Sequence, residues 1–94
     1  MYAKGRNPEC LKAKIAEFSQ SPLSCKTGAS LKQYTFQGKT VYVFAPGNCG
    51  ADMASSVVDE QCKNIGSLGG FTGNMKVNGE DFSSATYVKT IWSN

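Results

Sequence analysis

Acidic side chains are the residues of this chain best suited to acid–base chemistry. The sequence contains no histidine, which removes the commonest general base and any Ser-His or Cys-His nucleophile pair. The carboxylates that remain as candidates for an acid and base pair are Asp52, Asp59, Glu60, Glu80 and Asp81. Adjacent residues such as Asp59 and Glu60 would point to opposite faces of a strand. We therefore expect no catalytic residues and a protein that is not an enzyme.

Oxygen-bearing side chains gather around Gly79, at Asn74, Asn78, Glu80 and Asp81. Calcium prefers oxygen ligands of this kind, although the full EF-hand pattern is absent. The alternative is that Asn78-Gly79 forms a simple turn, with Glu80 and Asp81 at a helical cap. We favour the turn, expect no metal and no cofactor, and keep the four residues as a weak calcium candidate.

Four cysteines, at positions 10, 25, 49 and 62, are the other residues with chemistry of their own. An even number of cysteines in a short chain indicates disulfides, with a metal site as the alternative. Structural zinc sites build on closely spaced ligand pairs, and this chain has no Cys-x-x-Cys pair. Disulfides are the favoured interpretation and imply an oxidising compartment, while buried reduced thiols stay open as an alternative.

Four cysteines allow three pairings, and the sequence does not select one. We favour Cys10 with Cys25 and Cys49 with Cys62, because each pair then closes a local loop. Each bridge would contribute about 2–4 kcal/mol, mainly by restricting the unfolded chain.

The length of 94 residues predicts one domain, which we place at 8–94 after a loose arm at 1–7. Ten basic and seven acidic residues give a net charge of +3, and the basic residues are scattered with a single Arg. Such a distribution argues against nucleic-acid binding. No apolar run approaches the roughly 20 residues of a membrane span, and the first residues lack the apolar core of a signal peptide. We expect an export signal to have been removed, with a lipid anchor on the precursor left open.

The elements that must position these residues begin with a helix at about 8–20. Asn7 is a suitable N-cap, Pro8 fits the first helical position and Glu9 complements the helix dipole. The apolar side chains of Leu11, Ile15 and Phe18 then recur at helical spacing.

Residues 34–44 predict a β-hairpin around Gln37-Gly38-Lys39, within strands at about 29–37 and 39–46. Tyr34, Phe36, Val41 and Val43 fall on one face, which we expect to be core. Tyr42 and Phe44 fall on the opposite face, where they are either covered by another segment or exposed to grip a ligand. Burial is the favoured alternative.

Further strands are expected at 55–59, briefly at 65–68, and at 85–92 after a turn near 81–84. Trp92, the only tryptophan, is most simply a core residue, with stacking on a sugar or a partner as the alternative. Tyr42, Phe44 and Trp92 are therefore the candidate ligand patch. The predicted fold is α+β, with one N-terminal helix packed on an antiparallel sheet of about four strands, a central hairpin and disulfides.

A set of short motifs spans residues 9–92: Tyr-x-Phe-x-Gly-Lys-Thr-Val-Tyr-Val-Phe, Pro-Gly-Asn-Cys, Val-Val-Asp-Glu-Gln-Cys, Gly-Gly-Phe-Thr-Gly and a terminal Ile-Trp. Together they resemble an uncharacterised family of small exported cysteine-containing domains from Bacteroidetes-type bacteria. The resemblance implies a secreted, periplasmic or cell-surface domain held by cysteines, and it supplies no activity.

The function that follows is a small exported binding domain without catalytic activity, whose partner is another protein or a component of the cell envelope. One alternative is a secreted inhibitor of a hydrolase that presents a braced loop such as 46–53 to an active site. The other is a hydrolase that depends on carboxylates.

Overall fold

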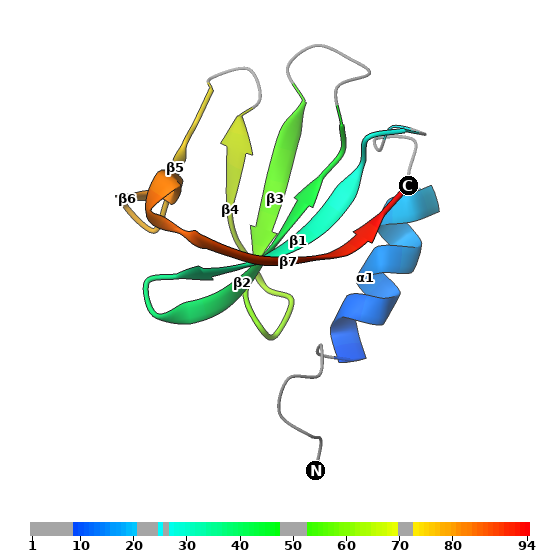
Figure 1. Cartoon of the computed structure of the whole chain (residues 1–94), viewed down its shortest axis with the longest axis horizontal. Helices are drawn as coiled ribbons and strands as arrows, with labels where there is room; N and C mark the ends of the chain where they lie inside the picture. Colours follow the sequence, from blue (N-terminus) through cyan, green and yellow to red (C-terminus); the bar gives the residue numbers. More distant parts are fainter. Residues whose placement is uncertain (1–8, 21–24, 26, 48–52, 70–72) are drawn as a thin grey trace.

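An antiparallel sheet of five strands with one helix against it forms the structure (Figure 1), a computed structural model that describes residues 9–20, 25, 27–47, 53–69 and 73–94. The strand order in this sheet is β4-β3-β2-β1-β7, and β5 and β6 form a separate small sheet. The elements are α1 (Glu9–Gln20), β1 (Ser30–Phe36), β2 (Lys39–Ala45), β3 (Ala54–Val58), β4 (Asn64–Gly69), β5 (Lys76–Val77), β6 (Glu80–Asp81), the 3₁₀ turn η1 (Phe82–Ser84) and β7 (Thr86–Ser93). The predicted α+β class is confirmed, with five strands in the main sheet rather than about four.

The predicted hairpin lies at the centre of the sheet, because β2 is the middle strand. Its turn is Gln37-Gly38, with φ angles of 54° and 74°, and Phe36 pairs with Lys39. Both angles are left-handed, as a two-residue primed turn requires, and glycine adopts this conformation without strain. The turn therefore fixes which side chains reach each face.

One face of the hairpin carries the far-side core, which consists of Phe36, Val41, Val43, Val57, Val77 and Phe82. The cross-strand pairs Tyr34 with Val41 and Val43 with Val57 place strands β1 to β3 on this cluster. The prediction that Tyr34, Phe36, Val41 and Val43 share a core face is confirmed.

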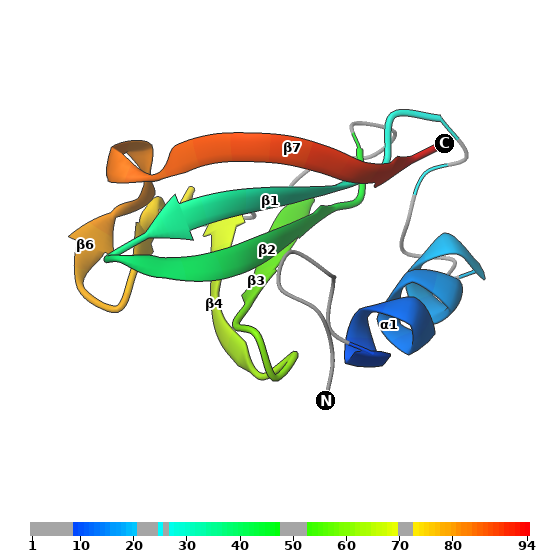
Figure 2. The ribbon, with the colours of Figure 1, turned by 60° about the horizontal axis from the view of Figure 1, so that its bottom comes forward.

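The other face carries the helix-side core, which consists of Leu11, Leu31, Tyr42, Phe44, Val58 and Cys62. Helix α1 lies on this side of the sheet (Figure 2), and its Leu11 is fully buried there. Ile15 and Phe18, one and two turns further on, pack against the same cluster. The helical spacing of these three residues thus explains how α1 is held.

A connection that the sequence did not predict as strands covers the far face. From the β4 edge, β5 and β6 form a hairpin through Asn78-Gly79, whose φ angles of 51° and 80° match a primed turn. Val77 lies over Gly66, whose absent side chain leaves room for it. Phe82 of η1 then contacts the rings of Tyr34 and Phe36 on β1. The connection therefore crosses the sheet before β7 pairs with β1.

The predicted disulfide pairing is wrong, because Cys10 is bonded to Cys62 and not to Cys25. The bridge joins the first turn of α1 to the turn between β3 and β4, and the two cysteines are separated by 52 positions in the sequence. Packing of α1 on the sheet brings these distant segments together, whereas the prediction assumed that the shortest loops close. Cys25 is also disulfide-bonded, and Cys49 lies outside the described residues.

Within the described part of the chain, no helix is long and apolar enough to cross a membrane.

Candidate functional site

The aromatic residues predicted as a ligand patch are largely covered. Tyr42 is 3% exposed and Phe44 is 5% exposed, because α1 lies over both of them. Trp92 is half-buried, and its ring meets the ring of Phe18 edge-on at 5.9 Å. An exposed patch made of these three aromatics is therefore wrong, since the helix provides the covering segment.

The four residues of the calcium candidate have structural hydrogen bonds instead of a shared centre. The side-chain amide of Asn74 donates to the carbonyl oxygens of Ser67 and Lys76. Glu80 accepts hydrogen bonds from Ser84 and Gln37, and Asp81 caps η1 by accepting from the backbone N–H of Ser83. Asn78 occupies the primed turn.

These hydrogen bonds also hold the carboxylates in their charged form. They lower the pKa of Glu80, chiefly through the Ser84 hydroxyl and then through Gln37. The backbone N–H of Ser83 lowers the pKa of Asp81 in the same way. Hydrogen bonds to a carboxylate favour its ionised form, so both groups are held as anions, and Asp81 also caps η1.

The remaining described carboxylates of the sequence prediction, Asp59 and Glu60, lie in the turn after β3. One oxygen of Asp59 accepts from the backbone N–H groups of Gln61 and Lys63, which closes this turn. Burial, and then the charge of Glu60, raises the pKa of Tyr42. Asp52 lies outside the described residues. Among the described residues, no three of the Cys, Asp and Glu side chains cluster in a way that would hold a metal ion.

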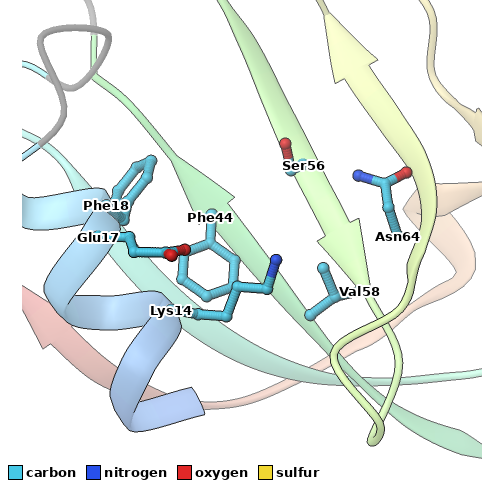
Figure 3. A pocket seen from close by; sticks show the side chains of 7 residues that line it. All are labelled: Lys14, Glu17, Phe18, Phe44, Ser56, Val58 and Asn64. Atoms are coloured by element: carbon cyan, nitrogen blue, oxygen red, sulfur yellow. The ribbon is translucent and has the colours of Figure 1, made fainter. Parts of the chain in front are cut away.

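An open groove of about 290 Å³ lies between α1 and the β3–β4 half of the sheet (Figure 3), and we call it the helix groove. Phe18, Phe44 and Val58 supply its apolar surface. Lys14 and Glu17 reach in from the helix, while Ser56 and Asn64 face them from β3 and β4. The groove therefore has an apolar floor between a charged wall and a polar wall.

The positions of these side chains follow from helix and strand periodicity. Lys14, Glu17 and Phe18 are three and four residues apart, so they share one side of α1. Phe44 pairs with Ser56, which places both on the helix side of the sheet. The rings of Phe18 and Phe44, both of which line the groove, meet edge-on at 5.3 Å.

A second hollow, of about 380 Å³, lies where three turns meet, and we call it the turn cleft. Its walls come from the β1–β2 turn, the β3–β4 turn and the β5–β6 turn. Phe36, Val41 and Ile65 contribute apolar surface. The polar lining residues are Gln37, Lys39, Thr40, Asp59, Glu60, Gln61 and Asn78. The two hollows share no lining residue within the described part of the chain.

Left-handed backbone at non-glycine residues gathers around the turn cleft. Within the described residues the three such positions are Gln37, Cys62 and Asn78, with φ angles of 54°, 62° and 51°. One lies in each of the three turns. This conformation is uncommon for residues other than glycine, and asparagine tolerates it best. Cys62 is held in it beside its bridge to Cys10.

Neither hollow was predicted from the sequence. Asn78-Gly79 and Gln37-Gly38 indicate turns, and Leu11, Ile15 and Phe18 indicate the buried helix face. Those signals locate each wall separately. They do not show that three turns meet at one end of the sheet or that α1 leaves part of the sheet uncovered.

The comparisons with known proteins bear on the family alone. A family model described as "Domain of unknown function (DUF6970)" matches residues 17–94. No curated protein and no solved structure shows significant similarity to the chain. The matched residues contain every described strand and every sheet residue of both hollows. Because the match covers well over half of the chain, the protein belongs to the DUF6970 family, whose function is unknown.

Proposed function

We propose that this protein is a binding domain without catalytic activity that receives an apolar side chain of a protein partner in the helix groove. The observation that carries the proposal is the apolar surface of Phe18, Phe44 and Val58, bordered by Lys14 and Glu17. Protein interfaces combine an apolar pocket with a polar rim in this way, and the pocket supplies most of the affinity.

The charged wall adds selectivity to the apolar floor. Lys14 and Glu17 have opposite signs and lie one helical turn apart on α1. A partner segment that carries an apolar residue beside a complementary pair of charges would satisfy both. Partners with the reversed order of charges would face repulsion, which gives specificity as well as attraction.

The proposed setting is an oxidising compartment outside the cytoplasm. The Cys10–Cys62 bridge and the disulfide at Cys25 support this, because stable disulfides are rare in the reducing cytosol. Secretion, a periplasmic or surface position, and an origin in Bacteroidetes-type bacteria remain predictions of the sequence. No feature of the described residues specifically favours an inhibitor or a hydrolase. Residues 48–52 of the predicted inhibitory loop lie outside the described part of the chain.

The test is capture of a partner from the envelope fraction of the source cell, with wild type and groove variants as baits. Ser56→Trp fills the groove with a large side chain from an exposed strand position, and Lys14→Glu reverses one charge of its wall. We expect both variants to reduce recovery of the partner by at least about tenfold, the effect of losing one well-buried contact.

Matched control variants separate groove binding from general effects. Lys12→Glu makes the same charge change at an exposed residue of α1 outside the groove, and Thr86→Trp adds the same ring to exposed β7. Both should retain the partner. Equal recovery with all four variants, at unchanged melting temperatures, would show that the groove is not the binding surface.

A further inference from the structure

The turn cleft differs from the helix groove in its chemistry, because polar side chains dominate its lining. We propose that it is a second binding site, independent of the groove, for a short saccharide that is neutral or carries an amino group. Its volume of about 380 Å³ falls at the lower end of the range for small-ligand sites. The hydrogen-bonding side chains that face the cleft, and the contacts that fix the turns carrying them, support this assignment.

Five lining side chains have hydrogen-bonding groups that no other described residue engages. They are Lys39, Thr40, Glu60, Gln61 and Asn78. The ammonium of Lys39 only donates and the carboxylate of Glu60 only accepts, whereas the hydroxyl and the two amides do both. This mixture of hydrogen-bond donors and acceptors suits a ligand whose groups can each donate and accept a hydrogen bond. Sugar hydroxyls have this property.

The side chains that line the cleft also disfavour the binding of a simple ion. A metal cation would need several oxygen ligands and no nearby ammonium, but Lys39 shares the cleft with Asp59 and Glu60. An inorganic anion would need donors alone, and it would face both carboxylates. The formal charge of the lining is −1, from one lysine, one aspartate and one glutamate. This favours neutral or amino-bearing sugars over sugars with a carboxylate.

The walls of the cleft are preorganised. Asp59 accepts from two backbone N–H groups and closes the turn that carries Glu60 and Gln61. Gln37 donates to Glu80 at 3.2 Å, which ties the β1–β2 turn to the β5–β6 hairpin. The bridge at Cys62 joins the β3–β4 turn to α1. Rigid walls reduce the entropy lost on binding, so modest polar contacts give measurable affinity.

The test is a titration of the isotope-labelled protein, followed by amide chemical shifts, with four short saccharides at millimolar concentration. One is neutral, one is N-acetylated, one bears a free amine and one bears a carboxylate. We expect shifts confined to the three turns for the first three sugars, and weaker binding of the carboxylate sugar.

The variant for this test combines Thr40→Val, Gln61→Ala and Asn78→Gly. The first is nearly isosteric, the second lies in an exposed turn, and glycine adopts the left-handed angle of position 78 without strain. Loss of three polar contacts should raise the Kd by about tenfold or more. The matched control is Thr86→Val with Gln20→Ala, at exposed residues that do not line the cleft, which should bind as wild type does.

The proposal is overturned if no saccharide shifts the amides of the three turns, or if the folded triple variant binds as tightly as wild type. Tighter binding of the carboxylate sugar would overturn the assignment of ligand charge. Shifts around Lys14 and Phe18 instead would place the saccharide in the helix groove and also contradict it. Partner capture through the groove is measured separately, so failure of one proposal leaves the other standing.

Discussion

Single residues in the helix-side core link the fold to the groove. Phe44 is buried beneath α1, contacts the ring of Phe18 and also forms the floor of the helix groove. Its side chain therefore stabilises the fold and, although only 5% of it is exposed, lines the groove where we propose that a partner binds. Tyr42 beside it is structural, and burial raises its pKa, so the ring stays neutral in the native protein.

Truncation of Phe44 tests how firmly α1 is packed. We expect Phe44→Ala to lower the free energy of unfolding by about 3–5 kcal/mol, because it leaves a cavity that the surrounding residues only partly fill. Val88→Ala, at a residue that is 46% exposed, should change it by less than about 0.5 kcal/mol. Urea denaturation measures both. A small effect at Phe44 would mean that the helix does not cover it in solution.

The hydrogen-bonded carboxylates of Glu80 and Asp81 predict that the stability of the protein depends on pH. The pKa values of Glu80 and Asp81 lie below the ordinary values of 4.5 and 3.8 in the folded protein. On acidification the unfolded chain therefore binds protons first, and stability falls as pH drops through these values. It is fully present above about pH 5, where both groups are ionised in either state.

Melting temperatures between about pH 6 and pH 3 test this for wild type and for the variant Glu80→Gln with Asp81→Asn. The amide side chains keep most of the hydrogen-bond geometry of the carboxylates, but they do not titrate in this range. We expect the variant to lose less stability on acidification than wild type does. If the melting temperatures of the two proteins fell equally with pH, the ionised forms of Glu80 and Asp81 would contribute nothing to stability.

At the scale of elements, the Cys10–Cys62 bridge fixes α1 to the sheet. The helix has 12 residues, and isolated helices of this length are marginal in water. Its attachment depends on Leu11, Ile15 and Phe18 together with the bridge at its first turn. Because α1 forms one wall of the helix groove, the bridge also supports the proposed binding surface.

Removal of this bridge by Cys10→Ala with Cys62→Ala should lower the free energy of unfolding by about 4 kcal/mol, given a sequence separation of 52. Peptide mapping without reduction checks the pairing. Cys49 and Cys62 lie on one tryptic peptide, so a second protease that cleaves after acidic residues is needed. We expect Cys10 linked to Cys62. A link between Cys10 and Cys25 would contradict the structure.

Strand β7 forms one edge of the sheet, and its structure discourages pairing with other chains. Its register against β1 shifts twice, after Leu31 and after Gln33. Such bulges twist an edge, and a lysine on the strand, here Lys89, adds a charge to it. The β7 edge is therefore a poor template for another strand.

At the scale of the whole molecule, the sheet has a core on each face. Helix α1 covers part of one face, and the β5–β6 hairpin with η1 covers part of the other. Each hollow lies where a cover ends: the groove beside α1, and the cleft beside the turn of β5–β6. The two hollows therefore differ in polarity because they lie beside different covering elements on opposite faces of the sheet.

The sequence by itself determined the local structure of this protein. Helical spacing at Leu11, Ile15 and Phe18, and strand alternation around Gln37-Gly38, fixed the helix, the hairpin and its two faces. These features depend on backbone preferences and side-chain periods within a few residues. Asn78-Gly79 likewise predicted a turn, although the short strands beside it were missed because two residues carry no periodic signal.

Only the tertiary structure decided the disulfide pairing, the cover over Tyr42 and Phe44, and both hollows. Each depends on contacts between segments far apart in the chain, such as Cys10 with Cys62 and Phe18 with Phe44. The preference for local loops in the predicted pairing followed chain entropy alone. Burial of the apolar faces of α1 and the hairpin outweighed that preference, and it brought the first turn of α1 to the β3–β4 turn.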